Sequence, residues 1–164
     1  MPSLTDFNAA DRAGAVAAVR PCLDIDRWVD AVVDGRPYGS VDDALSVAST
    51  AADAFTDDEL AQALRHHPRI GEPADGADAE ASLSRSEQAG VSTDAELRRR
   101  LAEGNRAYEQ RFGQVFLIRA AGRSAAQILD ALEERLAHDP ATEKSIMVEQ
   151  LREIALLRLE GMLR

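Results

Sequence analysis

The chain is organised around the stretch Leu64–Pro73, which reads LRHHPRIGEP, and the stretch Ser84–Gln88, which reads SRSEQ. Pro68 disfavours the helical conformation at His67 and lacks an N–H for the next turn, so a helix arriving from Leu60 is expected to end near His66. His67 then lies at a helix exit, where its imidazole can face a cleft. With an ordinary pKa of about 6.5, histidine is the side chain best suited to proton transfer near neutral pH.

Ser84, Glu87 and Gln88 follow at spacings of three and four. If residues 81–88 form a helix, these residues share one face and present a hydroxyl, a carboxylate and an amide together. A purely structural interpretation stays open, because a histidine before proline often only closes a helix and a face of this composition is often solvated. The two stretches are therefore candidates for a site with a His–Glu pair.

The composition restricts the classes of function. The chain has 164 residues, 29 acidic against 19 basic, and a net charge of −10, which argues against nucleic-acid binding. A single cysteine, Cys22, excludes an internal disulfide and a multi-cysteine metal site. No apolar run approaches the roughly 18 residues of a membrane span, and the N-terminus does not read as a signal peptide, so we expect no membrane association and a cytoplasmic protein.

Apolar side chains recur at intervals of three and four, and good helix formers dominate the composition. The sequence predicts an all-α fold, a single compact domain over residues 1–164, with about seven or eight helices. In the first half of the chain, we expect a helix over residues 8–19 capped by Asn8, a helix capped by Asp24 and ended by Gly35, a helix over residues 41–54 that begins after Ser40, and a helix that begins at the capping box Thr56–Glu59. In the second half, we expect a helix over residues 81–88 and a helix from the capping box Thr93–Glu96 to Phe112, ended by Gly113. A helix that begins after Ser124 and a last helix from Asp139-Pro140 to about Leu163 complete the set.

Val115–Ile118, which reads VFLI, is the one strongly β-prone run. Without a second strand to pair with, it is expected to be a buried extended segment near residues 115–119. Its backbone N–H and C=O groups then need partners, which a planar polar ligand, side chains or water could supply. Gly104 interrupts a helical face nearby, and we expect a close helix crossing there.

Arg158 projects from the apolar face of the last helix and requires an anion or an exit to solvent. It could snorkel to the surface, pair with a protein carboxylate such as Glu87 or Glu80, or bind a substrate carboxylate. A metal site at His66, His67 and Glu72 is not expected, because adjacent histidines at a helix end do not converge on one ion as an i, i+4 pair would.

Four ordered blocks resemble the 2-oxo-4-hydroxy-4-carboxy-5-ureidoimidazoline (OHCU) decarboxylase family of urate breakdown. The blocks are His67–Glu72 (HPRIGE), Ser84–Gly90 (SRSEQAG), Asn105–Gly122 and Glu153–Leu159, and Arg36-Pro37-Tyr38 is similar to a further element. The N-terminal third departs most, because Cys22-Leu23-Asp24-Ile25 stands where relatives tend to carry Cys-Cys-Gly-Ser.

The resemblance implies decarboxylation of OHCU to (S)-allantoin without a cofactor or metal, on an all-helical fold that commonly forms homodimers. A small-molecule substrate and a functional association with hydroxyisourate hydrolase or urate oxidase are also implied. The resemblance gives roles to nine residues: His67 and Glu87 as the catalytic acid/base and orienting pair, Pro68 as a wall, Ser84, Gln88 and Arg158 as groups that hold the substrate, and Phe116, Leu117 and Ile118 through their backbone. Two alternatives remain: a non-enzymatic helical interaction domain and a metal-dependent ureide hydrolase.

Overall fold

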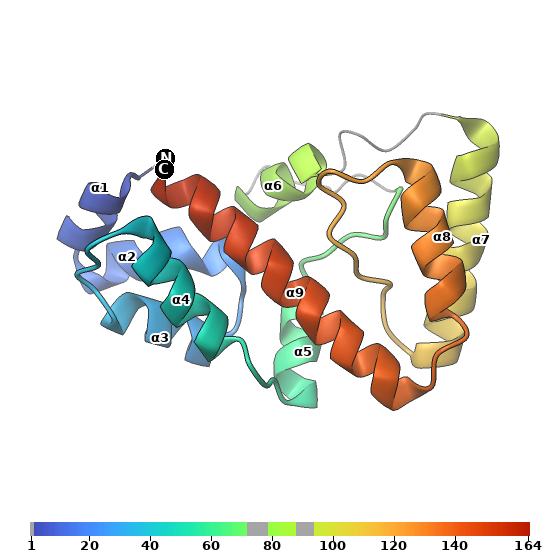
Figure 1. The fold of residues 1–164 in the computed structure, drawn as a ribbon, viewed down its shortest axis with the longest axis horizontal. Coiled ribbons are helices and arrows are strands. Elements are labelled where there is room, and N and C mark those ends of the chain that lie inside the picture. The colour runs from blue at the N-terminus through green and yellow to red at the C-terminus, as the bar shows by residue number, and fades with distance from the viewer. Residues whose placement is uncertain (1, 72–78, 88–93) are drawn as a thin grey trace. The chain divides into compact units, whose positions relative to one another are not determined.

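The computed structural model describes residues 2–71, 79–87 and 94–164, and all its regular structure in these ranges is helical (Figure 1). It contains nine α-helices and one short 3₁₀ helix, with no β strand among the described residues. The prediction of an all-α fold is therefore confirmed. The helices are α1 Leu4–Ala9, α2 Arg12–Val19, η1 Arg20–Cys22, α3 Asp26–Asp34, α4 Val41–Ala51, α5 Asp57–Leu64, α6 Ala79–Glu87, α7 Ala95–Phe112, α8 Ala125–Arg135 and α9 Pro140–Leu163.

Contacts group the chain into two compact units. Unit 1 comprises Met1–Ala63 and Arg152–Arg164, and unit 2 comprises Leu64–Leu151. One boundary falls inside α9, so this helix contributes residues to both units, and the other falls just before Leu64, the last residue of α5. None of the helices in the described part of the chain is both long and apolar enough to cross a membrane.

Unit 1 is built on the pair α3 and α4. Trp28 is completely buried, and its indole N–H donates to the carbonyl of Ala48 at 2.9 Å, which joins the two helices. Tyr38 is buried beside them, and its hydroxyl donates to the carbonyl of Val32 at 2.6 Å. Buried tryptophan and tyrosine contribute large apolar area provided that their polar atoms find partners, as both do here.

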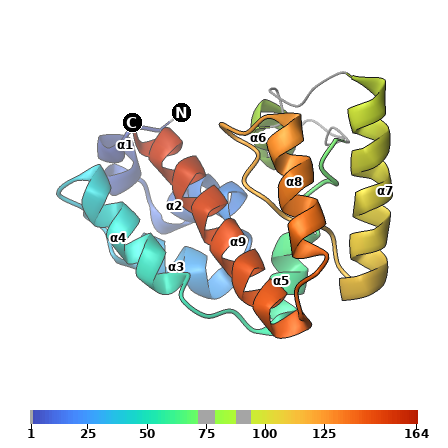
Figure 2. The ribbon, with the colours of Figure 1, turned by 45° about the vertical axis from the view of Figure 1, so that its right-hand side comes forward.

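Unit 2 is built on the pair α7 and α8, which lie side by side in Figure 1 and Figure 2. Gly104 allows their close approach: a Cβ atom at this position would collide with Cδ2 of Leu132 and lie 3.1 Å from its Cγ. The close helix crossing expected at Gly104 is therefore confirmed. The unit buries Leu101, Tyr108, Phe116, Ile128, Leu132 and Met147.

Most of the helix boundaries follow the capping residues read from the sequence. Ser40 accepts from the N–H of Asp43, the Ser124 capping box is formed, and Gly113 ends α7 in the left-handed conformation with φ 72°. Thr56 and Glu59 cap α5 reciprocally, at 2.9 and 3.1 Å. Side-chain oxygens at these positions satisfy N–H groups that the first turn of a helix leaves without partners.

Three expected caps were wrong or fall outside the described residues. Asn8 lies within α1 and hydrogen-bonds the backbone of Tyr38 through both ends of its amide, while Ser3 and Asp11 cap the two short helices that replace the single one expected. Asp24 does not cap α3, because it pairs with Arg20 at 2.7 Å. Thr93 lies outside the described residues, and Asp94 caps α7.

Candidate active site

His67 lies directly after α5, as expected from the proline that follows it. The helix ends at Leu64, and the N–H of His67 donates to the Leu64 carbonyl at 3.1 Å. The imidazole of His67 is only 6% exposed, whereas that of the neighbouring His66 is 44% exposed. Pro68 is half-buried. The turn thus buries one histidine of the pair and leaves the other at the surface.

α6 buries a polar face. Glu80, Ser84 and Glu87 are spaced i, i+4 and i+7 and therefore lie on one side of the helix. Ser84 is 2% exposed, the Glu80 side chain 12%, and Glu87 is half-buried. Ser82, Arg85 and Ser86 are exposed. A surface helix normally buries an apolar stripe, and a buried carboxylate is costly unless it is paired, so this reversal makes the buried face of α6 a candidate for the functional site.

Glu80 and His67 face each other in unit 2. Nε2 of His67 lies 3.9 Å from Oε1 of Glu80, and Nδ1 of His66 lies 3.8 Å from its Oε2. These separations exceed a direct hydrogen bond, but one bridging water or a small closure on a ligand would connect the groups. Glu80 was absent from the residues expected in the site, although its position four residues before Ser84 could have placed it on the same face.

The structure describes only one of the next two expected site residues, Glu87 and Gln88. Glu87 ends α6 on the face that carries Glu80 and Ser84, and its pairing with His67 stays a prediction. Gln88 lies outside the described residues.

The turn around His67 is hydrogen-bonded to α7. The side-chain amide of Asn105, which is 2% exposed, donates to the carbonyl of Ile70 at 2.9 Å. One turn further along α7, Glu109 accepts from Arg69 at 2.6 and 3.2 Å, a two-pronged pair. Gly71 turns the chain with φ 90°, which non-glycine residues rarely adopt. Two polar residues of α7 thus hold the turn that follows His67 through Arg69 and Ile70.

Phe116, Leu117 and Ile118 form a buried segment outside the helices, as expected for 115–119. They are 1%, 4% and 4% exposed, and no strand pairs with them in the described ranges. The guanidinium of Arg135 donates to the carbonyl of Leu117 at 2.7 Å and stacks 4.5 Å from the centre of the Phe116 ring. A side chain, in place of a neighbouring strand, therefore satisfies part of the hydrogen-bonding capacity of this backbone.

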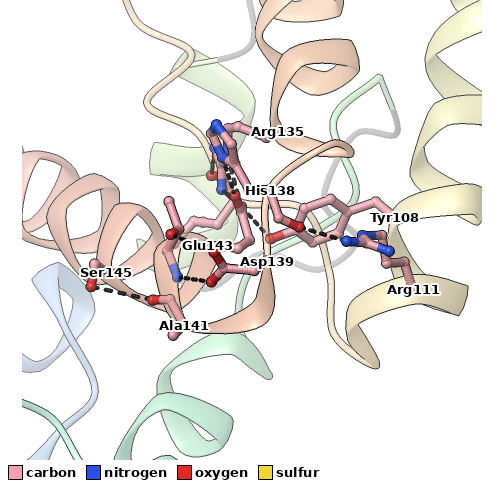
Figure 3. A network of polar contacts seen from close by, with 10 residues as sticks. Tyr108, Arg111, Arg135, His138, Asp139, Ala141, Glu143 and Ser145 are labelled. Atoms are coloured by element: carbon pink, nitrogen blue, oxygen red, sulfur yellow. Dashed lines mark hydrogen bonds and ion pairs between the residues drawn. The ribbon is translucent and has the colours of Figure 1, made fainter.

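Arg135 belongs to a buried network that the sequence did not reveal (Figure 3). Glu143, which is completely buried, accepts from Nε of Arg135 at 2.7 Å and from the hydroxyl of Tyr108 at 2.5 Å. Its second oxygen lies 3.3 Å from Nδ1 of His138. Burial and the Glu143 carboxylate raise the pKa of the Tyr108 phenol, so this hydroxyl stays a donor at every physiological pH.

Arg158 is placed in unit 1. It is 4% exposed, which rules out snorkelling to solvent, and Nη1 donates to the carbonyl of Pro21 at 3.0 Å. A substrate-binding role for Arg158 stays a prediction. In the described part of the chain, no three His, Cys, Asp or Glu side chains converge as a metal-ligand cluster would.

Comparison with known proteins gives consistent results. The sequence matches the family model described as OHCU decarboxylase over residues 8–160. It is 29% identical to the 2-oxo-4-hydroxy-4-carboxy-5-ureidoimidazoline decarboxylase of Haloferax volcanii, over 96% of this chain and 94% of that protein. It is 36% identical to the uric acid degradation bifunctional protein TTL of Arabidopsis thaliana, over 60% of this chain and 32% of that protein. A crystal structure of OHCU decarboxylase in the presence of (S)-allantoin has a TM-score of 0.70 at 25% identity, covering 88% of this chain and 96% of that one.

Proposed function

The chain belongs to the OHCU decarboxylase family, and on that premise we propose that the buried face of α6 and His67 form the centre at which OHCU loses carbon dioxide to give (S)-allantoin. The protein is then a carboxy-lyase of urate degradation. The observation that supports this assignment of the site is the buried imidazole of His67 facing a carboxylate of α6 at 3.9 Å. Proton transfer near neutral pH requires a group of this kind in a sheltered position.

The substrate supplies its own electron sink. The bond between ring carbon 4 and the carboxylate breaks, its electron pair enters the C4–C5 bond, and the pair of the C5=N bond moves onto nitrogen, which takes a proton. The C4 hydroxyl then loses a proton while carbon 5 gains one, so the reaction consumes one proton overall. The protein has to orient the breaking bond, stabilise the electron-rich intermediate and direct the last proton to one face.

We assign the proton transfers to His67. A carboxylate from α6 orients the imidazole and stabilises its charged form, because an opposite charge nearby favours the protonated state. Glu87 is the partner that the resemblance implies, and Glu80 is the carboxylate that lies 3.9 Å from Nε2 of His67. Ser84, Gln88, Pro68 and the backbone of residues 116–118 bind the heterocycle in this scheme.

The assignment is tested with freshly generated OHCU, followed by its ultraviolet absorbance and by the optical activity of the allantoin formed. His67→Ala and Glu87→Ala are each expected to lower the rate by at least about 100-fold. His66→Ala is the matched control, and its loss of rate is expected to be much smaller because the side chain of His66 is 44% exposed, whereas that of His67 is 6% exposed. Full activity in both His67→Ala and Glu87→Ala would remove this mechanism.

The same assay separates the alternatives. A metal-dependent ureide hydrolase would lose activity in EDTA, whereas the proposed reaction keeps its rate. An interaction domain without catalysis would leave the spontaneous decay of OHCU unchanged.

The proposal also covers the oligomeric state of the protein, its compartment and its pathway partners. We propose a cytoplasmic homodimer that works beside hydroxyisourate hydrolase or urate oxidase, and the similarity to a bifunctional uric acid degradation protein supports the pathway association. Light scattering on the purified chain tests the dimer, and a monomer across the working concentration range would contradict it.

A further inference from the structure

Two side chains from other elements, one on α8 and one on α9, hydrogen-bond the backbone on either side of Ile118. Nη1 of Arg135 donates to the carbonyl of Leu117 at 2.7 Å, and Oε1 of Gln150 accepts from the N–H of Arg119 at 2.9 Å. These bonds occupy the last carbonyl before Ile118 and the first N–H after it. They therefore fix the two peptide planes that flank this residue.

The orientation of these planes determines where the polar groups of Ile118 point. The one cis peptide bond in the described ranges is Arg36–Pro37, so both planes are trans. In a trans peptide the C=O and the N–H point in opposite directions. With the Leu117 carbonyl directed at Arg135, the N–H of Ile118 points away from Arg135. With the Arg119 N–H directed at Gln150, the carbonyl of Ile118 points away from Gln150.

The N–H and C=O of Ile118 have no hydrogen-bond partner among the residues that the structure describes, although the residue is 4% exposed. A buried backbone donor and acceptor without partners are costly and rare in native proteins. A ligand with a carbonyl next to an N–H, such as the edge of a cyclic urea or a ureido group, offers the complementary pair. The OHCU ring and allantoin both carry such edges.

Arg135 is itself rigidly held. Glu143, completely buried, accepts from Arg135 and Tyr108 (Figure 3). The rings of Phe116 and Tyr108 lie 4.5 and 5.8 Å from the guanidinium carbon of Arg135. A buried guanidinium is tolerated because a carboxylate neutralises it, and removal of either charge leaves the other uncompensated. The network therefore keeps the Leu117–Ile118 peptide in one orientation.

We propose that Arg135, held by Glu143 and Tyr108, acts together with Gln150 as a positioning residue that directs the N–H and C=O of Ile118 at the amide edge of the substrate. This proposal rests on the proposed function and deepens it. Neither side chain touches the substrate in this scheme. Both act through the backbone, so they affect the binding of substrate and product more than the chemical step.

The test measures KM and kcat for OHCU, and the inhibition constant for allantoin, in Arg135→Lys and Gln150→Leu. Lysine keeps the charge beside Glu143 but lacks the planar fork, and leucine removes the acceptor for the Arg119 N–H. We expect KM and the allantoin inhibition constant to rise together by about tenfold, with kcat changed less than about threefold, as loss of uniform binding predicts.

A matched pair of phenol deletions separates positioning from general destabilisation. Tyr108→Phe removes the hydroxyl that donates to Glu143, and Tyr38→Phe removes a hydroxyl buried in unit 1. Both are expected to lower the melting temperature, but only Tyr108→Phe should raise KM and the allantoin inhibition constant.

The outcomes are distinct. A wild-type protein without decarboxylase activity would overturn the proposed function and this inference with it. An active wild type, with folded variants whose KM and allantoin inhibition are unchanged, would overturn this inference alone. If Arg135→Lys does not fold, Gln150→Leu and Tyr108→Phe decide by the same criterion.

Discussion

The imidazole of His67 and the carboxylate of Glu80 face each other across 3.9 Å, although one follows α5 and the other lies in the first turn of α6. Both side chains are largely buried, at 6% and 12% exposure, so solvent screens their interaction less than it would at the surface. Glu80 is therefore an alternative to Glu87 as the carboxylate that would orient the imidazole proposed to be catalytic.

Replacing each carboxylate by its amide identifies the orienting group. Glu80→Gln keeps the size of the side chain and removes its charge, so we expect kcat to fall by about 10- to 100-fold with KM little changed. Steady-state kinetics on OHCU measure this, with Glu103→Gln, an exposed carboxylate paired with Arg99, as the control. If Glu80→Gln is fully active and Glu87→Gln is not, Glu87 is the orienting group and the facing position of Glu80 has no catalytic role.

Asn105 is expected to support the site by holding the turn after His67. In Asn105→Leu the carbonyl of Ile70 loses its donor inside the protein, which costs about 1–3 kcal/mol of unfolding free energy. We also expect a lower kcat, because the turn carries His67. Urea denaturation and kinetics measure the two effects.

The control for Asn105→Leu is a variant of Glu109, which lies in the same helix, α7, and pairs with Arg69 of the same turn. Glu109→Gln weakens only the more exposed pair with Arg69 and is expected to cost less than about 1 kcal/mol. Equal losses of stability in the two variants would contradict the special role of Asn105.

Gly104 should be intolerant of alanine for a packing reason. Its Cβ would collide with the side chain of Leu132, so Gly104→Ala is expected to destabilise by about 1–3 kcal/mol despite the better helix propensity of alanine. Gly161→Ala is the matched control, since it adds a methyl group to another helix where no atom lies within 4 Å. It should stabilise by about 0.5–1 kcal/mol. Opposite signs in thermal unfolding are the expected result, and a neutral Gly104→Ala would show that α7 and α8 can separate without cost.

Glu59 gives a pH-dependent contribution to stability. Its pKa is lowered, first by the hydrogen bonds from Arg27 and then by the N–H of Thr56. A carboxyl group whose folded-state pKa is depressed stabilises the protein above its unfolded pKa of about 4.3, and this stability is lost as the pH falls through the folded-state value. Glu59→Gln keeps the amide oxygen for the cap and removes the charge. We expect it to cost about 0.5 kcal/mol at pH 7 and nothing at the acidic end of a urea-denaturation series. A pH-independent difference would mean that the Arg27 pair does not carry the effect.

The parts of the fold that depend on neighbouring residues were predictable. The caps at Ser40, Thr56, Ser124 and Asp139 involve atoms within a few residues of one another, so the sequence states both partners. The expectations for Asn8 and Asp24 were wrong for the complementary reason. Asn8 bonds the backbone of Tyr38, 30 residues away, and Asp24 bonds Gln62, 38 residues away, in addition to its neighbour Arg20. These bonds occupy the side chains that were expected to cap.

The sequence by itself determined the helical class, the position of most helix ends and the placement of a histidine at the exit of α5, because periodicity, capping and the restraint imposed by Pro68 act over a few bonds. Only the tertiary structure decided that Glu80 faces His67, that Arg158 bonds the carbonyl of Pro21, and that Arg135 and Glu143 hold the segment around Leu117. These partners are far apart in the chain or on different elements. Burial selects them, because a polar group removed from water requires whichever partner the packing brings within reach.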